Sequence, residues 1–306
     1  RLWLQLAIDA SGKGPTPPLF EFGKHMGLHA NKKGGDGWMF EDKADAWGMR
    51  RWQLAGALAF GDYNNDTWVD FVGTGVHASP ELYWNRPGKG FVFEEVAAFR
   101  ETGNVPPGCV AADFDNDGFT DLYMTRAAWF GNGPNRLFRN VDGGGFEDRS
   151  LGSGSELMGQ NSCGATALDF NKDGLLDLAV TGTAGGTLRL LKNLGEMAFE
   201  EVTADLGILP TETVAVSVST GDLNGDGWPD LFVNTRSSLK SEKQAPGNGP
   251  NHLYLSDGKG GYTEAAEERG VAWGTTQGFA SWFFDVDNDG DLDLVQCGRP
   301  RRGVCT

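Results

Sequence analysis

The sequence lacks the features that mark most membrane, zinc-binding and disulfide-rich proteins. No run of about 18 apolar residues occurs, so we expect no membrane insertion. Four cysteines among 306 residues are too few for a disulfide-dense scaffold, and neither CxxC nor a Cys/His cluster with zinc spacing appears. Cys297 and Cys305, or Cys109 and Cys163, could be bridged in an oxidising compartment. The alternative for Cys109 and Cys163 is that they are small buried apolar side chains.

Motifs of common enzyme families are also absent. The four histidines do not form an HExxH spacing, and the sequence has no GxSxG elbow, Walker loop or dinucleotide fingerprint. We therefore predict no catalytic residues and no organic cofactor. The chain begins at Arg1 without a methionine or a signal-peptide pattern, so we interpret it as a mature or trimmed product.

Five short acidic loops stand out against this background. The clearest is Asp113–Asp121 (DFDNDGFTD), with oxygen-bearing side chains at positions 1, 3, 5 and 9 and glycine at position 6. Alternating oxygen ligands suit Ca²⁺, and the glycine supplies the positive φ that closes the turn. We number the loops 1 to 5 in chain order. The metal candidates are Asp62, Asn64, Asp66 and Asp70; Asp113, Asp115, Asp117 and Asp121; Asp169, Asn171, Asp173 and Asp177; Asp222, Asn224, Asp226 and Asp230; and Asp285, Asp287, Asp289 and Asp293.

The loops differ from EF-hands and from one another. An EF-hand needs a bidentate glutamate at position 12 and flanking helices, whereas position 12 is here never glutamate and short apolar runs such as Leu231–Val233 follow each loop. The loops are therefore predicted to join strands. Backbone carbonyls at position 7 are expected to complete each site. Thr67 replaces the glycine in loop 1, so the Asp62–Asp70 site is the least certain of four or five expected Ca²⁺ ions.

The negative net charge of the chain comes largely from these loops. The net charge of −16 argues against nucleic acid and anionic membranes as partners. Seventeen of the loop side chains at positions 1, 3, 5 and 9 are carboxylates, and five bound Ca²⁺ ions would bring the net charge to about −6. We attribute the acidity to metal-site charge.

The loops mark an internal repeat. They begin 51 to 63 residues apart, and each of the first four is followed by a strand, a glycine turn and a second strand. An apolar stretch such as Phe279–Phe284 precedes each loop. Four antiparallel strands per unit of about 50 residues predict an all-β fold, a β-propeller of four-stranded antiparallel blades. A β-sandwich of unrelated hairpins would not produce this period.

We predict a single propeller domain over residues 1–306 that begins and ends within a blade. Residues 1 to 22 resemble the second half of a unit, and residues 285 to 306 the first half. Two interpretations remain: the halves complete each other in a closed ring of five blades, or the chain is part of a larger ring. Residues 28 to 54 form a long connection with Trp38, Trp47 and Trp52, which either bind a partner or ligand, or fill the core or cover a blade edge.

These residues resemble a known repeat family. Gly221–Val233 (GDLNGDGWPDLFV) is similar to the FG-GAP/VCBS repeat, as in the propeller of integrin α chains. Asn135–Asn140 (NRLFRN) and Phe199–Ile208 (FEEVTADLGI) resemble the subgroup related to cartilage acidic protein. The resemblance covers essentially the whole chain. It implies a calcium-bearing propeller, usually of seven blades, that is extracellular or faces another extracytoplasmic compartment.

Three functions follow as hypotheses. The first is a non-enzymatic module for protein interaction, assembly or cell adhesion, with structural calcium; the partner is unidentified, and the chain could be a subunit of a larger assembly. The second is a lectin-like glycan binder whose exposed aromatic side chains stack on sugars. The third is a carbohydrate-active enzyme built on the same fold.

Overall fold

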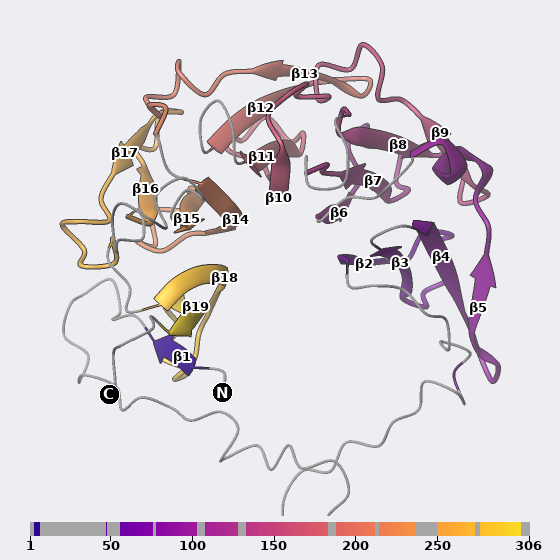
Figure 1. Ribbon diagram of the computed structural model, residues 1–306, viewed down its shortest axis with the longest axis horizontal. Coiled ribbons are helices and arrows are strands. Elements are labelled where there is room, and N and C mark those ends of the chain that lie inside the picture. The colour runs from indigo at the N-terminus through magenta and orange to yellow at the C-terminus, as the bar shows by residue number, and fades with distance from the viewer. Residues whose placement is uncertain are drawn as a thin grey trace, which may run out of the picture.

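The computed structural model of the chain describes residues 3–6, 47, 56–75, 78–102, 108–127, 133–182, 188–211, 214–236, 250–272 and 276–300. These residues form five antiparallel sheets arranged around a central opening (Figure 1). Four of the sheets have four strands in sequential order, and we call them blades 1 to 4. The predicted all-β fold of four-stranded antiparallel blades is confirmed. No helix among the described residues is long and apolar enough to cross a membrane.

Each blade contains one acidic loop between its first two strands. The strands are β2 (Leu58–Gly61), β3 (Asp70–Gly75), β4 (Ala78–Arg86) and β5 (Gly90–Glu94) in blade 1; β6 (Cys109–Ala112), β7 (Asp121–Met124), β8 (Arg136–Asn140) and β9 (Phe146–Asp148) in blade 2; β10 (Ser162–Leu168), β11 (Asp177–Gly182), β12 (Leu188–Gly195) and β13 (Ala198–Glu201) in blade 3; and β14 (Val214–Gly221), β15 (Asp230–Arg236), β16 (His252–Ser256) and β17 (Tyr262–Glu264) in blade 4. The first strand of each blade lies nearest the central opening (Figure 1). A short 3₁₀ helix, η1 (Ala97–Thr102), follows blade 1.

The fifth sheet joins the two ends of the chain. Strand β1 (Trp3–Leu6) pairs antiparallel with β19 (Asp293–Pro300), which pairs with β18 (Thr276–Phe284). We call this three-stranded sheet sheet 5. Loop 5 connects β18 to β19, as the first two strands of a blade are connected. An N-terminal strand thus lies beside the C-terminal half-unit, as one of the two sequence interpretations requires.

The second strand of each blade supplies the core on both of its faces. In β7, Leu122 packs in a cluster with blade 1, whereas the next residue, Tyr123, packs in a cluster with blade 3. In β15, Leu231 packs toward blade 3 and Phe232 toward sheet 5. Successive side chains of a strand point to opposite faces, so a strand packed between two sheets must be apolar at nearly every position. This explains the continuous apolar runs after the loops.

The described cysteines are both free thiols. Cys109 in β6 is half-buried and Cys163 in β10 is buried, and they are not joined by a disulfide. The proposal that they are bridged is therefore wrong; the alternative of a small buried side chain is correct for Cys163, whereas Cys109 is only partly buried. Burial raises the pKa of the Cys109 thiol to about 12 and that of Cys163 to about 11, which keeps both protonated at neutral pH. The side chain of Cys297, and Cys305, lie outside the described residues.

The long connection of residues 28 to 54 is described at one position. Trp47 is half-exposed, and its carbonyl oxygen accepts the N–H of Phe91 in β5 at 2.8 Å. The connection therefore meets the outer strand of blade 1 at this residue. Trp38 and Trp52, which the sequence hypothesis groups with it, lie outside the described residues.

Because neighbouring blades share their cores, truncation of one buried side chain should destabilise the array. We expect Leu122→Ala to lower the free energy of unfolding by about 2–5 kcal/mol, since Leu122 is fully buried between blades 1 and 2. Leu151→Ala is the control, because Leu151 is 97% exposed, and should change stability by at most about 0.5 kcal/mol. Chemical denaturation measures both; equal losses would contradict this account of the core.

Candidate metal centres in the acidic loops

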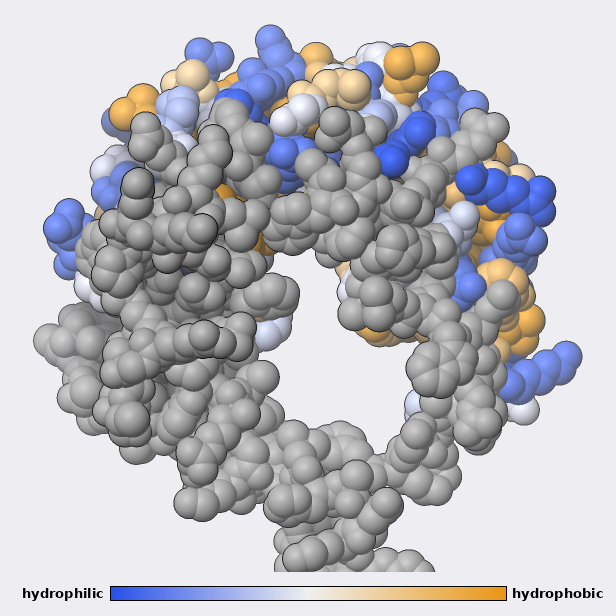
Figure 2. All heavy atoms as spheres, in the orientation of Figure 1, coloured by the Kyte–Doolittle hydropathy of each residue, from blue (hydrophilic) through white to orange (hydrophobic). Residues whose placement is uncertain are grey.

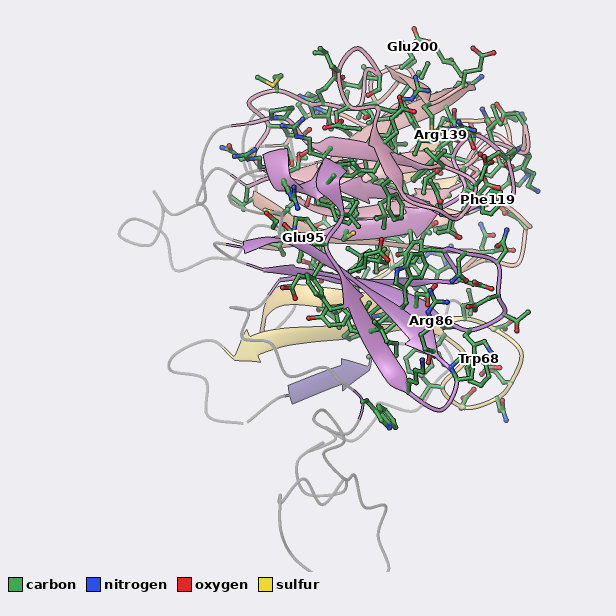
Figure 3. The ribbon with its side chains drawn as sticks, turned by 90° about the vertical axis from the view of Figure 1, so that its right-hand side faces the viewer. Trp68, Arg86, Glu95, Phe119, Arg139 and Glu200 are labelled. Atoms are coloured by element: carbon green, nitrogen blue, oxygen red, sulfur yellow. The ribbon has the colours of Figure 1, made fainter. Side chains whose placement is uncertain are left out.

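The acidic loops lie along one face of the array of sheets. Each runs from the end of a first strand to the start of the second strand, so the repeat places them all at the same end of their sheets. Figure 3 shows Trp68 and Phe119, which occupy position 7 of loops 1 and 2, toward the same face. The predicted candidates are thus brought together within each loop, and the loops form a row.

The carboxylate at position 1 organises each turn. In loop 2, the Asp113 carboxylate accepts the N–H of Asp117 at 3.1 Å on one oxygen and the N–H of Gly118 at 2.9 Å on the other. The equivalent pair of bonds occurs in all five loops. The position 5 carboxylate accepts the N–H of position 7, as from Phe119 to Asp117 at 2.9 Å. Position 6 has positive φ, as the sequence predicts.

Loop 1 departs from the others at this position. Thr67 adopts φ 73°, close to the φ 88° of Gly118 in loop 2. A β-branched residue in this region is strained by about 1–2 kcal/mol, whereas glycine is not. The loop 1 turn therefore forms with the same hydrogen bonds but stores strain that the glycine-bearing loops lack.

The donor atoms fit a hard cation. Single carboxylate oxygens of Asp113, Asp115 and Asp117 lie within 4.8 Å of one another, and those of Asp285, Asp287 and Asp289 do the same. In loops 3 and 4 position 3 is asparagine, whose Oδ1 accepts the N–H of position 5 at 3.0 Å and 2.9 Å respectively. A site built only from oxygen donors at a tight turn suits Ca²⁺. The position 7 carbonyls stay a prediction.

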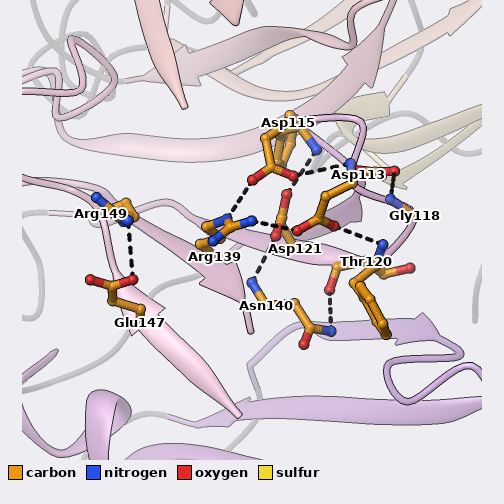
Figure 4. Close-up of polar contacts among 12 residues, drawn as sticks. Asp113, Asp115, Gly118, Thr120, Asp121, Arg139, Asn140, Glu147 and Arg149 are labelled. Carbon is orange, nitrogen blue, oxygen red and sulfur yellow. Dashed lines mark hydrogen bonds and ion pairs between the residues drawn. The ribbon is translucent and has the colours of Figure 1, made fainter. Parts of the chain in front are cut away.

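The carboxylate at position 9 is buried and has a different environment. In loop 2, the fully buried Asp121 accepts the N–H of Phe114 at 2.8 Å and the N–H of Asn140, in the third strand, at 2.7 Å (Figure 4). Both bonds have equivalents at Asp70, Asp177 and Asp230. These carboxylates tie the loop to strand three of its own blade.

Burial makes the charge at position 9 costly. It raises the pKa of Asp121 and Asp177 to about 7 and that of Asp230 to about 6; the backbone N–H bonds oppose the rise, and the other loop carboxylates add to it. Burial is also the main cause that raises the pKa of Asp70. A cation held among the other carboxylates of the loop would lower these pKa values again.

Basic side chains of the third strand form ion pairs with carboxylates of loops 1, 2 and 3. Arg139 pairs with both Asp115 and Asp117 (Figure 4), Arg86 lies 3.4 Å from Asp66, and Lys192 lies 3.8 Å from Asp173. Within the described ranges, loops 4 and 5 have no such ion pair. The sequence pattern of the loops does not include these cations, because they lie 19 to 24 residues from the carboxylates they meet.

Asparagine at the end of the third strand links neighbouring blades. Asn140 Nδ2 donates to the carbonyl of Tyr63 in loop 1 at 2.8 Å and to that of Thr120 in its own blade at 3.0 Å. Asn193 makes the same two contacts with Phe114 in loop 2 and with Leu176. The recurring asparagine was visible in the hairpin pattern, but its reach to the preceding loop was not.

Comparison with known proteins identifies the repeat. The sequence model of a family described as FG-GAP-like repeat matches residues 53–124 and 169–233. Cartilage acidic protein 1 of Xenopus tropicalis is 33% identical over 162 residues, which cover 50% of this chain and 24% of that protein. The human protein of the same name is 30% identical over 153 residues, 48% of this chain and 23% of that protein. The chain spans about a quarter of the length of these relatives.

A solved structure shows a more distant likeness. A lectin of Agrocybe aegerita that recognises non-reducing terminal N-acetylglucosamine superposes with a TM-score of 0.47 at 16% identity, over 78% of this chain and 60% of the lectin. A similarity of this size does not transfer a ligand.

The position 9 carboxylate gives a direct test of the loop geometry. In Asp121→Asn, one acceptor oxygen becomes an NH₂ group that faces a backbone N–H, so a buried bond is lost and two donors oppose each other. We expect the free energy of unfolding to fall by about 1–3 kcal/mol. Asp142→Asn, at an exposed turn of the same blade with φ 50°, should be nearly neutral, because asparagine tolerates that conformation. Equal stability of the two variants in urea denaturation would refute the assigned role of Asp121.

Proposed function

Since this chain carries FG-GAP-like repeats on propeller blades, we propose that it is a non-enzymatic, calcium-binding module for protein interaction or adhesion that works in an extracytoplasmic compartment. The single observation that carries the calcium assignment is the carboxylate cluster at positions 1, 3 and 5 of loops 2 and 5, whose oxygens lie within 4.8 Å of one another. Like charges at that separation repel, and a divalent cation would turn the repulsion into attraction.

The loop residues themselves show what calcium would stabilise. Asp113 closes the turn through two backbone N–H groups, Asp117 fixes the peptide that follows, and Asp121 anchors the turn to the third strand. Bound calcium supplies positive charge and a rigid set of oxygen contacts. Its structural effect would therefore be to hold the first three strands of a blade together.

The support for an interaction module comes from the repeat and its relatives. The matched relatives are named cartilage acidic protein 1, which is not an enzyme name. Figure 2 shows hydrophilic and hydrophobic side chains interspersed over the coloured surface, a composition that transient protein interfaces share with the rest of a protein surface.

A glycan ligand is a second candidate because of one side chain. Trp68, at position 7 of loop 1, is 46% exposed on the loop face, beside carboxylates that would be metal-bound (Figure 3). An exposed indole next to a calcium site can stack on a sugar ring whose hydroxyl groups approach the metal.

Calcium content tests the leading proposal. We expect four or five Ca²⁺ ions per chain by elemental analysis and a marked fall in melting temperature in EDTA, because each ion present at about 100 times its Kd stabilises the fold by about 2.7 kcal/mol. Asp226→Ala should lose one ion, and its melting temperature should fall further below that of the parent chain in calcium than in EDTA, where it lacks only the hydrogen bonds that Asp226 accepts, such as that from the Trp228 backbone N–H. Glu268→Ala, an exposed carboxylate near the same blade, is the control. An ion-free chain indifferent to EDTA would contradict the proposal.

A glycan array with and without calcium separates the two candidates. The interaction-module proposal predicts no sugar binding in either condition. Calcium-dependent binding that Trp68→Ala lowers at least tenfold, while Trp68→Phe retains it, would instead establish the glycan-binding function.

A further inference from the structure

The residue at position 4 of each acidic loop holds a left-handed backbone conformation. Asn65, Asn116 and Lys172 have φ of 56°, 57° and 58°, and Asn288 in loop 5 has φ 65°. Asparagine adopts this conformation readily, whereas lysine is uncommon there. Position 4 is not among the metal candidates, so its side chain is available for another contact.

In loops 1 and 2 that contact is with the next loop. Asn65 Nδ2 donates to the carbonyl of Gly118 in loop 2 at 3.0 Å, and Asn116 Nδ2 donates to the carbonyl of Gly174 in loop 3 at 3.0 Å. Both bonds join position 4 of one loop to position 6 of the following loop. The same geometry thus occurs at two successive junctions.

The peptide group that accepts the bond also contacts a metal candidate. Its carbonyl belongs to Gly118 and its N–H to Phe119, and that N–H donates to Asp117 at 2.9 Å. A peptide group is planar, so its carbonyl and N–H turn together. Asn65 of loop 1 and Asp117 of loop 2 therefore both hydrogen-bond to the same rigid peptide group. The peptide group after Gly174 joins Asn116 to Asp173 in the same way.

The third junction uses different chemistry at equivalent positions. Lys172 Nζ lies 4.2 Å from the centre of the Trp228 ring, at position 7 of loop 4, which is a cation–π contact. The Trp228 N–H donates to Asp226 at 2.8 Å. Position 4 of loop 4 is Gly225, which has no side chain to reach loop 5.

Resting on the calcium sites proposed above, we propose that Asn65, Asn116 and Lys172 are positioning residues that couple neighbouring loops, so that calcium binds cooperatively along loops 1 to 4 and independently at loop 5. An ion bound in loop 2 fixes Asp117, and through it the peptide group that Asn65 contacts. Part of loop 1 is therefore already ordered before loop 1 binds its own ion. By linkage, an ion in loop 1 assists loop 2 to the same extent.

Calcium titration by isothermal calorimetry tests the coupling. The unaltered chain should show a Hill coefficient above 1. Asn116→Ala should lower it and weaken binding at loops 2 and 3 by about 2- to 10-fold, the range expected for loss of one hydrogen bond. Asn116→Gly should have the same effect, because it removes the amide without straining the left-handed backbone. At the third junction, Lys172→Gln should uncouple loop 4, whereas Lys172→Arg should retain the cation–π contact and the coupling.

Asn288→Ala is the matched control. It replaces the same residue type at the same loop position with φ 65°, but within the described residues Asn288 makes no hydrogen bond to another loop. It should affect loop 5 alone. Full calcium uptake with independent sites, or equal changes in cooperativity from Asn116→Ala and Asn288→Ala, would overturn the coupling and leave the proposed function standing. Absence of calcium uptake by the unaltered chain would overturn both.

Discussion

The buried carboxylate at position 9 is the constraint on which the blade geometry depends. Asp70, Asp121, Asp177 and Asp230 are inaccessible to solvent, and each accepts one backbone N–H from its own loop and one from the third strand. A buried backbone N–H without a partner is costly, and so is a buried carboxylate without donors. The carboxylate and the backbone N–H groups satisfy one another by hydrogen bonding. These bonds fix the position of the turn relative to the hairpin that follows it.

The interfaces between sheets then follow from the alternation of side chains in the second strands. From blade 1 to blade 4 the interfaces have apolar cores, since alternate residues of β7 and β11 enter the cores on their two sides, and a hydrogen bond from Asn135 to Ser162 at 3.0 Å also crosses between blades 2 and 3. The interface of blade 4 with sheet 5 adds a polar network. Asn234 donates to Ser281 at 2.8 Å, Gln296 donates to Asn234 at 2.7 Å, and Ser219 donates to the carbonyl of Ser281 at 2.6 Å. Hydrogen bonds impose a stricter geometry than apolar contact, so they add specificity to this junction.

On the loop face, the repeat that builds the blades also places the negatively charged carboxylates of successive loops in a row. Among the described residues, loops 1 to 3 have a basic side chain that forms an ion pair with their carboxylates, and the more exposed of these pairs contribute little to stability. Most of the charge is therefore left for cations from solution, which is why calcium would act on the stability of the whole array. The contacts between successive loops make the row one connected surface.

The sequence alone determined the period, the antiparallel blades, the positions of the five loops and the positive φ of loop position 6, including that of Thr67. These are local properties: alternating apolar residues, glycine turns and regularly spaced aspartates act within about ten residues of one another. Tertiary structure decided the rest. Asn140 reaches Tyr63 across 77 positions, Asn65 reaches Gly118 across 53, and β1 pairs with β19 at the other end of the chain. An asparagine looks the same in a sequence whether it caps a turn or bridges two blades. Only the packing of one blade against the next gives its amide a particular carbonyl to bind.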